Sequence, residues 1–259
     1  MSHLVLTLVL SFGMMTALWP LSLKLADVSI IDILWAPAFA VLGLACFIAT
    51  PVTGARAAIA VALVLVWAIR LGSHIFARWS HLGHEDYRYA EMRRQRGANF
   101  PLVSLVTIFW LQALLLWIIS FPLQAAASSD APLGVLDVVG TVLALAGIVI
   151  ETVADWQLTH FRADPANRDK VMDQGLWSWS RHPNYFGDFV LWWGFFLLGM
   201  ASGAPWWTIL GPLVMSALLI HFSGAGLMED TIIVRRPGYA DYIRRTSLFV
   251  PWPPQGEKP

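Results

Sequence analysis

Four polar or charged side chains, those of Arg181, His182, Asn184 and Asp188, lie within eight consecutive residues. Arg181 and His182 stand directly before Pro183, which is a favourable first residue of a helix because its missing N–H would have no partner there. A cationic pair at the start of a helix favours an anion, since the side-chain charge adds to the unsatisfied N–H groups of the first turn. Asn184 and Asp188 follow on one face of the expected helix. The pattern predicts an anion-binding site with polar groups behind it.

A second group of ionisable residues follows the spacing of a helix. It consists of Glu151, Asp155, Thr159 and Arg162. Separations of four, four and three residues place all of them on the same side of a helix. Glu151 and Asp155 repel each other unless a cation or a donor-rich ligand lies between them. This group is either one wall of a polar cofactor cavity or the solvated end of a helix.

Two further features place ionisable groups inside apolar stretches, where they are costly and therefore functional candidates. Arg70 and His74 share a helical spacing with Trp67 and Arg78. They are suited to a phosphate or a carboxylate, but a basic stripe at the headgroup region has the same pattern. Asp32 is a lone carboxylate near the start of an apolar stretch. It is either a helix-start residue at the membrane surface or a proton-handling group.

The tail after residue 228 holds a fourth group of charged and aromatic residues. Paired arginines and tyrosines can clamp phosphates and stack on a nucleobase. They can equally bind anionic lipid headgroups, and charge alone leaves both interpretations open. The group comprises Glu229, Arg235, Arg236, Tyr239, Tyr242, Arg244 and Arg245.

These groups are carried by a very apolar chain. Of its 259 residues, 57% are hydrophobic and only 13% are charged, and the mean hydropathy is +0.61, a balance foreign to a soluble domain. A helix that spans the bilayer needs about 20 mostly apolar residues, and its backbone groups must be hydrogen-bonded within the segment. We therefore predict an all-α, polytopic membrane protein with seven transmembrane helices, folded as a single domain over residues 1–259. The expected spans are residues 3–22, 29–50, 57–77, 102–124, 134–157, 185–202 and 205–227.

Basic residues are distributed unevenly among the connections between these spans. Residues 78–100, residues 158–184 and the tail after 228 are rich in Arg and Lys, whereas the connections 51–56, 125–133 and 203–204 hold one basic residue, Arg56. The positive-inside rule places the three basic regions and the C-terminus in the cytoplasm, and the N-terminus outside. We expect these loops to cap a cofactor site on the cytoplasmic side of the membrane, the inner membrane if the chain is bacterial. The single cysteine, Cys46, excludes a disulfide framework and a thiolate metal site.

The segment 175–188 reads Gly-Leu-Trp-Ser-Trp-Ser-Arg-His-Pro-Asn-Tyr-Phe-Gly-Asp. It resembles the signature of the DUF1295 membrane proteins, which belong with the C-terminal domain of steroid 5-alpha-reductases. Three further pieces agree, so the resemblance covers nearly the whole chain. They are Ser29-Ile-Ile-Asp-Ile-Leu-Trp35; Glu85-Asp-Tyr-Arg-Tyr89 with Met92-Arg93; and Ser223-Gly224 to Glu229 with Tyr239, Tyr242 and Val250-Pro251.

This resemblance implies an NADPH-dependent reductase that reduces a carbon–carbon double bond conjugated to a ketone in a lipophilic, steroid-like substrate. In the family, an acidic residue and an arginine seven positions later contact the cofactor, and Asp155 and Arg162 match that spacing. Asn184 and Asp188 match the family's asparagine and acidic residue four positions apart. The steroid enzymes have asparagine where Glu151 stands and usually glutamate in the place of Asp188, so the contacts differ in detail there. The candidate cofactor contacts, most of them within residues 134–259, are Glu151, Asp155, Arg162, Trp177, Arg181, His182, Asn184, Tyr185, Asp188, Glu229, Arg235, Arg236, Tyr239 and Tyr242.

The implied chemistry is hydride transfer to the β-carbon of an enone. The ketone oxygen must be polarised during the transfer, and the α-carbon must then receive a proton. Asp32 is the candidate hydrogen-bond donor to this oxygen, assisted by Arg70 or His74. The glutamate and tyrosine that hold the ketone in the eukaryotic enzymes have no match by identity, and Asp32 and Trp67 fall nearest.

Two other classes of protein are alternatives. Isoprenylcysteine carboxyl methyltransferases share an Arg-His-Pro-x-Tyr turn and paired tyrosines in the tail, and they bind S-adenosylmethionine. The Asn-Tyr-Phe-Gly-acidic continuation after the turn, together with Asp155 and Arg162, favours the reductase. Ionisable groups inside the spans argue against the second alternative, a lipid-binding scaffold without catalysis. We expect membrane lipids and a lipophilic small molecule as partners, and neither a metal ion nor a nucleic acid.

Overall fold

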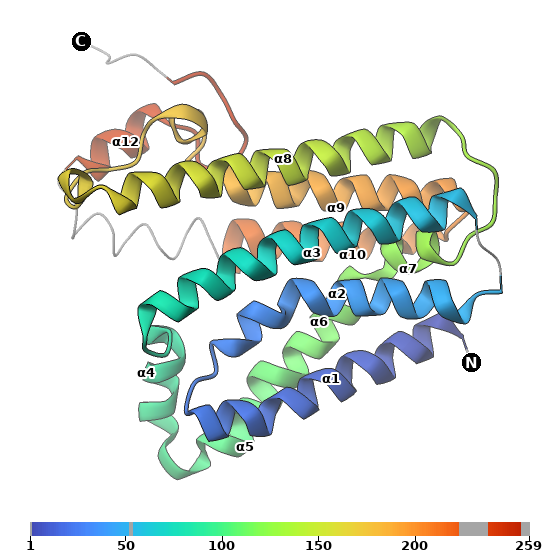
Figure 1. Cartoon of the computed structure of the whole chain (residues 1–259), viewed down its shortest axis with the longest axis horizontal. Helices are drawn as coiled ribbons and strands as arrows, with labels where there is room; N and C mark the ends of the chain where they lie inside the picture. Colours follow the sequence, from blue (N-terminus) through green and yellow to red (C-terminus); the bar gives the residue numbers. More distant parts are fainter. Residues whose placement is uncertain (1, 52–53, 223–237, 255–259) are drawn as a thin grey trace. The chain divides into compact units, whose positions relative to one another are not determined.

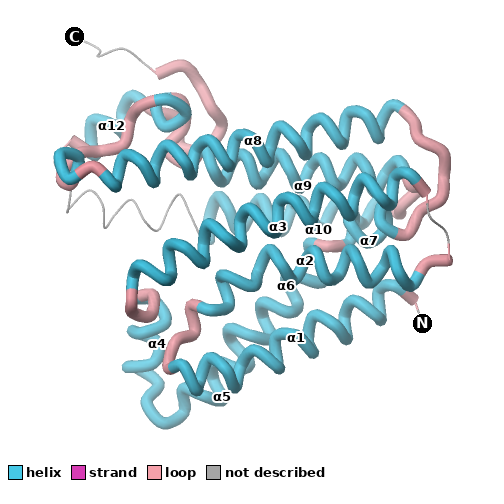
Figure 2. Tube along the Cα trace, in the orientation of Figure 1, coloured by secondary structure: helices cyan, strands magenta, loops and turns pink. Residues whose placement is uncertain are grey.

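The computed structural model describes residues 2–51, 54–222 and 238–254, and nearly all of them are helical (Figure 1). This described part of the chain is built from helices and loops without a β-strand (Figure 2), apart from an isolated bridge between Ser180 and Ser247. The predicted all-α fold is therefore confirmed.

The helices of the described chain differ greatly in length. The long ones are α1 (His3–Leu25), α2 (Ile30–Ala49), α3 (Ala55–Leu82), α8 (Val135–Ala163) and α9 (Pro183–Ala201). The shorter ones are α4 (Tyr87–Arg96), α5 (Phe100–Ser104), α6 (Leu111–Ile119), α7 (Phe121–Ala127), α10 (Leu210–Ala217) and α12 (Tyr239–Arg245). π-Helical turns occupy Leu105–Trp110 and Leu218–Phe222. 3-10 turns occupy Gly97–Asn99, Pro165–Asn167, Gly175–Ser178 and Trp206–Ile209.

Five helical stretches of the described chain are long and apolar enough to cross a membrane. They are α1, α2, α3, the continuous stretch Tyr87–Ile119 and α8, as expected of a polytopic membrane protein. The sixth predicted span, 185–202, coincides with α9. The seventh corresponds, over its described residues, to the shorter apolar helix Trp206–His221. The count of seven spans and the orientation of the termini stay predictions.

The predicted loop 78–100 is largely helical in the structure. Helix α3 continues to Leu82 and ends at Gly83, whose positive φ of 66° suits a residue without a side chain. Asp86 then caps α4 by accepting a hydrogen bond from Arg88 N. The polar sequence of α4 carries no hydropathy signal of a membrane span, so hydropathy alone does not predict this helix.

The predicted span 102–124 is interrupted in the structure. Its helix ends at Ile119, and the separate helix α7 begins at Phe121. Pro122 stands in the first turn of α7, the position where the missing N–H of proline costs least. An apolar stretch of this length therefore contains two helices, because its proline favours a new helix start.

The chain divides into two compact units, and each is described by itself. Unit 1 comprises Met1–Asp137 and Phe196–Gly211, and unit 2 comprises Val138–Phe195 and Pro212–Pro259. Helices α8 and α9 contribute residues to both units. The single reductase domain expected from the sequence stays a prediction.

A buried ion pair in unit 1 connects the start of α3 to the first turn of α8. Arg56 Nε lies 2.6 Å from Asp137 Oδ1, and Arg56 Nη2 lies 2.9 Å from Asp137 Oδ2. The remaining guanidinium N–H groups donate to Ser129 Oγ and to the carbonyl oxygens of Ala131 and Pro132. The two charged side chains are only 1% and 3% exposed. Arg56, which we expected in a short connection between spans, is therefore a structural anchor of unit 1.

Close packing of α8 against α9 organises unit 2. A Cβ atom added to Gly147 would lie 2.5 Å from Gly187 O, and one added to Gly187 would lie 2.6 Å from Glu151 N. One added to Gly194 would lie 2.7 Å from both Ala144 N and Gly140 O. The backbones of the two helices therefore touch at positions where only glycine fits, as small residues allow in membrane helix pairs.

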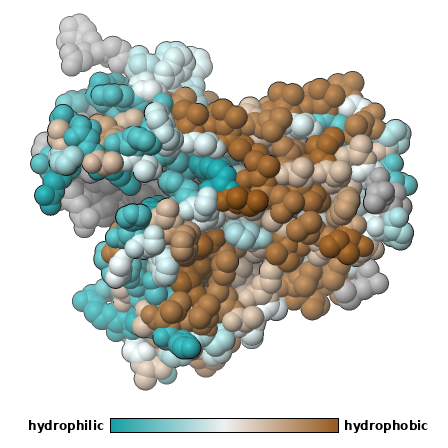
Figure 3. All heavy atoms as spheres, in the orientation of Figure 1, coloured by the Kyte–Doolittle hydropathy of each residue, from teal (hydrophilic) through white to brown (hydrophobic). Residues whose placement is uncertain are grey.

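Apolar side chains cover the outer sides of the long helices in each unit. Ile48 and Ile69 of unit 1 are 78% and 70% exposed, and Val138 and Val142 of unit 2 are 64% and 59% exposed. Figure 3 shows hydrophobic side chains along much of α8 and hydrophilic ones around α4 and α12. Apolar exposure along whole helices fits lipid as the surrounding solvent.

Replacing Gly187 with Ala is expected to destabilise the protein by about 1–3 kcal/mol, because the added methyl group overlaps the backbone of α8. Thermal unfolding of the purified protein in detergent measures this effect. Gly13→Ala is the matched control, since a Cβ atom there meets nothing within 4 Å. Equal melting temperatures for the two variants would show that α8 and α9 do not pack in this way.

Replacing Arg56 with Gln is expected to cost about 3–5 kcal/mol of stability, because it leaves the carboxylate of Asp137 buried without its counter-ion. The same thermal measurement applies, with Arg96→Gln as the control at an exposed arginine, where we expect a change within about 0.5 kcal/mol. A melting temperature for Arg56→Gln as high as that of the control would contradict a structural role for the pair.

Candidate functional site

The segment 175–182, which we call the signature turn, is fixed to α8 in unit 2. Gly175 has a φ of 58°, and a Cβ atom there would clash with Gln157. Leu176 N donates to Gln157 Oε1 over 3.0 Å, and Trp177 Nε1 donates to Ala154 O over 2.9 Å. The glycine that opens the signature is therefore required by both its conformation and its close contact with α8.

The predicted polar residues of α8 and α9 meet directly after this turn. Asn184 Nδ2 donates to Asp155 Oδ1 over 3.0 Å. Glu151, Asp155 and Asp188 are all buried, at 4%, 6% and 8% exposure. The amide oxygen Oδ1 of Asn184 is also buried, and no hydrogen bond reaches it from the described residues. Because Asp155 takes the amide N–H, this oxygen is oriented to accept a hydrogen bond from a ligand.

The aromatic residues predicted to contact a cofactor take different positions. The rings of His182 and Tyr185 stack at 5.6 Å with an interplanar angle of 7°. Trp177, Tyr239 and Tyr242 are buried, and Tyr242 O–H donates to Trp177 O over 2.6 Å. The two tyrosines thus pack inside unit 2, and their contact with a cofactor stays a prediction.

The predicted cationic groups divide into buried and exposed ones. Arg181 is buried, and its Nη1 donates to the carbonyl oxygens of Ile243 and Thr246, each over 2.9 Å. Arg162 is exposed on the last turn of α8. Glu229, Arg235 and Arg236 lie outside the described residues.

In unit 1, Asp32 takes part in a polar network between α2 and α4. Tyr89 O–H donates to Asp32 Oδ1 over 3.2 Å, and Arg88 Nη2 lies 3.9 Å from Asp32 Oδ2. Arg88 also donates through Nε to Asp86 Oδ1 over 2.9 Å. The structure thus brings together two separate pieces of the family resemblance, the one around Asp32 and the one around Tyr89. The sequence pattern did not indicate a contact of Asp32 with Tyr89 or Arg88, although both stand in one of these pieces.

The linkers before α2 and α4 are joined by the same network. Asp86 N donates to Ser29 Oγ and Val28 N donates to Glu85 Oε1, each over 2.8 Å. Arg93 binds both carboxylate oxygens of Glu85, at 3.0 and 2.8 Å. Burial raises the pKa of Asp86, but hydrogen bonds from the side chain and backbone of Arg88 outweigh this, so its pKa lies below its ordinary value. Glu85 and Asp86 therefore hold the linker before α2 against the linker before α4.

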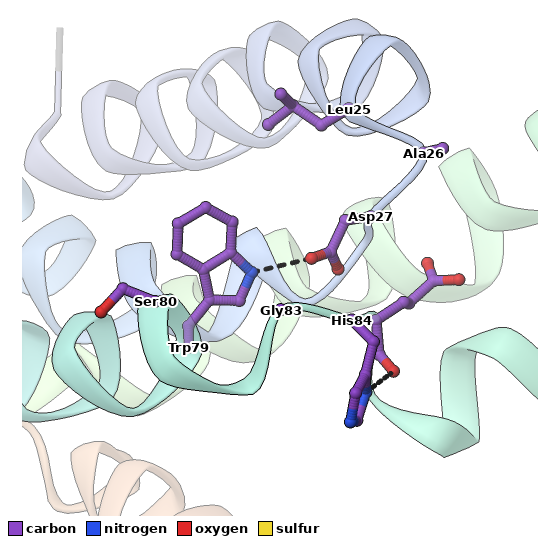
Figure 4. Close-up of a pocket in the computed structure, with 8 residues that line it drawn as sticks. Leu25, Ala26, Asp27, Trp79, Ser80, Gly83 and His84 are labelled. Atoms are coloured by element: carbon purple, nitrogen blue, oxygen red, sulfur yellow. Dashed lines mark hydrogen bonds between the residues drawn. The ribbon is translucent and has the colours of Figure 1, made fainter.

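A cavity of about 490 Å³ opens beside this network (Figure 4). Its lining residues are Leu25, Ala26, Asp27, Trp79, Ser80, Gly83, His84 and Glu85. Figure 4 shows Trp79 turned toward Asp27, and its indole N–H donates to Asp27 Oδ2 over 2.7 Å. Asp32 and Tyr89 are not among the lining residues. The cavity therefore adjoins the predicted catalytic carboxylate without containing it.

The other predicted catalytic residues lie on α3. Arg70 and His74 are half-buried there, one turn apart. Trp67, on the preceding turn, is completely buried, with its ring 5.8 Å from Phe39. Within the described ranges, no group of three or more His, Cys, Asp or Glu residues is placed to hold a metal ion.

Long apolar helices that carry buried ionisable groups define an α-helical membrane protein. A model of the family described as "Protein of unknown function (DUF1295)" matches residues 18–246, and the chain belongs to this family. The chain is also similar to the uncharacterized protein C594.04c of Schizosaccharomyces pombe (strain 972 / ATCC 24843), with 26% identity over 275 residues that cover 95% of this chain and 79% of that protein. No solved structure matches the chain significantly. The resemblance to the DUF1295 proteins is therefore confirmed, and the relation to steroid 5-alpha-reductases stays an expectation.

Proposed function

We propose that the chain is an integral-membrane reductase that uses NADPH to reduce a conjugated carbon–carbon double bond in a lipophilic, steroid-like substrate. The observation that carries this proposal is the buried pair of Asp155 and Asn184 in unit 2. A buried polar atom without a partner costs free energy, so Asn184 Oδ1 requires a hydrogen-bond donor. The carboxamide N–H₂ and the ribose hydroxyls of NADPH are donors of this kind.

The surrounding residues also fit a nicotinamide nucleotide. The carboxylates of Glu151, Asp155 and Asp188 are acceptors for hydroxyl groups. Arg162 and His182 would hold phosphate oxygens at the end of α8 and at the N-terminus of α9. NADPH, when bound, supplies a hydride; the residues of unit 2 bind it and exclude water.

The residues around Asp32 in unit 1, taken by themselves, are suited to stabilise the oxygen of an enone substrate. Addition of hydride to the β-carbon of an enone moves negative charge to the ketone oxygen, and a proton then joins the α-carbon. Tyr89 O–H donates its one proton to Asp32 in the structure, and we assign to it the hydrogen bond to the ketone oxygen once the hydroxyl turns from Asp32 to the bound substrate. Arg88 Nη2 lies 3.9 Å from the other carboxylate oxygen of Asp32.

Replacing Asn184 with Ala is expected to weaken NADPH binding about tenfold or more, since a buried hydrogen bond of about 1–3 kcal/mol is lost. Isothermal titration of the purified protein in nanodiscs measures the affinity. Asn99→Ala is the control, because Asn99 is exposed in unit 1, and its affinity should equal that of the wild type. Binding of S-adenosylmethionine but not NADPH by the wild type would favour the methyltransferase class and refute the proposal.

Replacing Tyr89 with Phe is expected to lower the turnover of an enone by about 100-fold or more, because the donor to the oxygen is lost, while NADPH affinity stays unchanged. NADPH oxidation with a 4-en-3-one steroid as the probe substrate gives the rate. Tyr87→Phe is the matched control, since Tyr87 stands on the same helix and is 65% exposed. Wild-type turnover in the Tyr89 variant would remove this residue from the mechanism.

A further inference from the structure

The segment Tyr239–Trp252, which we call the C-terminal strap, is hydrogen-bonded along the signature turn of unit 2. Arg181 N donates to Ser247 O over 2.8 Å, and Trp252 N donates to Trp179 O over 2.9 Å. Ser180 and Ser247 form a parallel bridge between the two segments. The backbone of the turn is therefore paired with a part of the chain more than 60 residues away in sequence.

Side chains of the turn and of the strap add three more connections. Ser180 Oγ donates to Phe249 O over 2.8 Å, and Tyr242 O–H donates to Trp177 O over 2.6 Å. Arg181 Nη1 donates to Ile243 O and Thr246 O. Carbonyl groups at the end of a short helix have no partner within it, so Arg181 caps the C-terminus of α12. The guanidinium group of Arg181 therefore binds main-chain acceptors within the protein.

Aromatic packing fixes the strap to the helix that follows the turn. The ring of Phe249 lies 5.9 Å from that of Phe186 and 5.5 Å from that of Phe189, both edge-on. Phe249 is 7% exposed, and Ser180 and Tyr242 are 0% and 2% exposed. Water therefore does not compete for these contacts, and a shift of the strap would have to move the turn with it.

We propose that the C-terminal strap sets the conformation of the signature turn, and that Arg181, Ser180 and Tyr242 are positioning residues. Asn184 follows Arg181 by three positions, so a displacement of the turn changes the contact between Asn184 and Asp155. That this displacement affects NADPH binding rests on the proposed function. The strap contributes mainly backbone carbonyl groups to the turn, which leaves most of its own side chains without a direct part in the interaction.

Hydrogen exchange of the full-length protein in nanodiscs, followed by mass spectrometry without nucleotide, tests the proposal. Tyr242→Phe and Ser180→Ala are each expected to accelerate amide exchange in peptides covering both 176–186 and 247–252. Leu248→Ala is the matched control within the strap, since its side chain is 36% exposed, and it should leave the turn unchanged. The milder Ser180→Ala decides the question if Tyr242→Phe fails to fold.

Faster exchange confined to the strap, with the turn as slow as in the wild type, would overturn the proposal. NADPH affinity of Tyr242→Phe is the second measurement, and we expect about a tenfold loss, equal to about 1.4 kcal/mol. If amide exchange in the turn becomes faster but NADPH affinity is unchanged, the conformation of the turn does not control cofactor binding. Because exchange is measured without nucleotide, its outcome stands even if the wild type binds no NADPH.

Discussion

The backbone contact between α8 and α9 is the constraint on which the candidate cofactor site depends. Lipid offers no hydrophobic gain for bringing two helices together, so their association relies on close packing and on polar contacts. Gly147, Gly187 and Gly194 allow the backbones to touch, and only at that separation does Asn184 reach Asp155. Gly187 stands inside the family signature. Its part in that signature is to bring two helices together, and the neighbouring polar residues are placed by the packing that it permits.

Unit 1 is stabilised in another way, through polar groups at both ends of α3. Arg56 at the beginning of the helix is buried with Asp137, and Glu85, just beyond its end, binds Arg93 and the linker before α2. Polar interactions are least costly at the ends of a membrane helix, where water and headgroups are near. The ends of helix α3 therefore determine where the linkers lie. The same arrangement delivers Tyr89 to Asp32.

Some of this organisation could be predicted from the sequence, for physical reasons. A membrane helix depends on the summed hydropathy of about 20 neighbouring residues, so α1, α2, α3 and α8 were recognisable within a few residues of their ends. Helix α4 is polar and escaped that criterion. The spacing of Asp155 and of Asn184 indicated the face on which each lies, and the structure brings these two residues together. Hydropathy and periodicity are properties of neighbouring residues, so they predict local features such as helices and helix faces.

Contacts between distant segments were harder to predict. Asp32 and Tyr89 are separated by 57 positions, and neither local pattern indicates the other. The charge of Arg181 suggested an anion, but its Nη1 binds main-chain carbonyl groups of Ile243 and Thr246. A carbonyl oxygen exists at every residue, so no residue type marks it as a partner. Tyr239 and Tyr242 are buried as parts of the same strap, and amino-acid composition does not predict their burial.

The pairing of the signature turn with the C-terminal strap also has a consequence for biosynthesis. The turn leaves the ribosome well before residues 239–252 are made, and its helices are by then available for insertion into the membrane. Until the strap arrives, the carbonyl groups that receive Arg181 and Ser180 do not exist. A chain interrupted shortly before Tyr239 would thus contain every long helix and still lack the ordered turn. Membrane insertion and maturation of the site are therefore separate events, and the second waits until residues 239–252 have been translated.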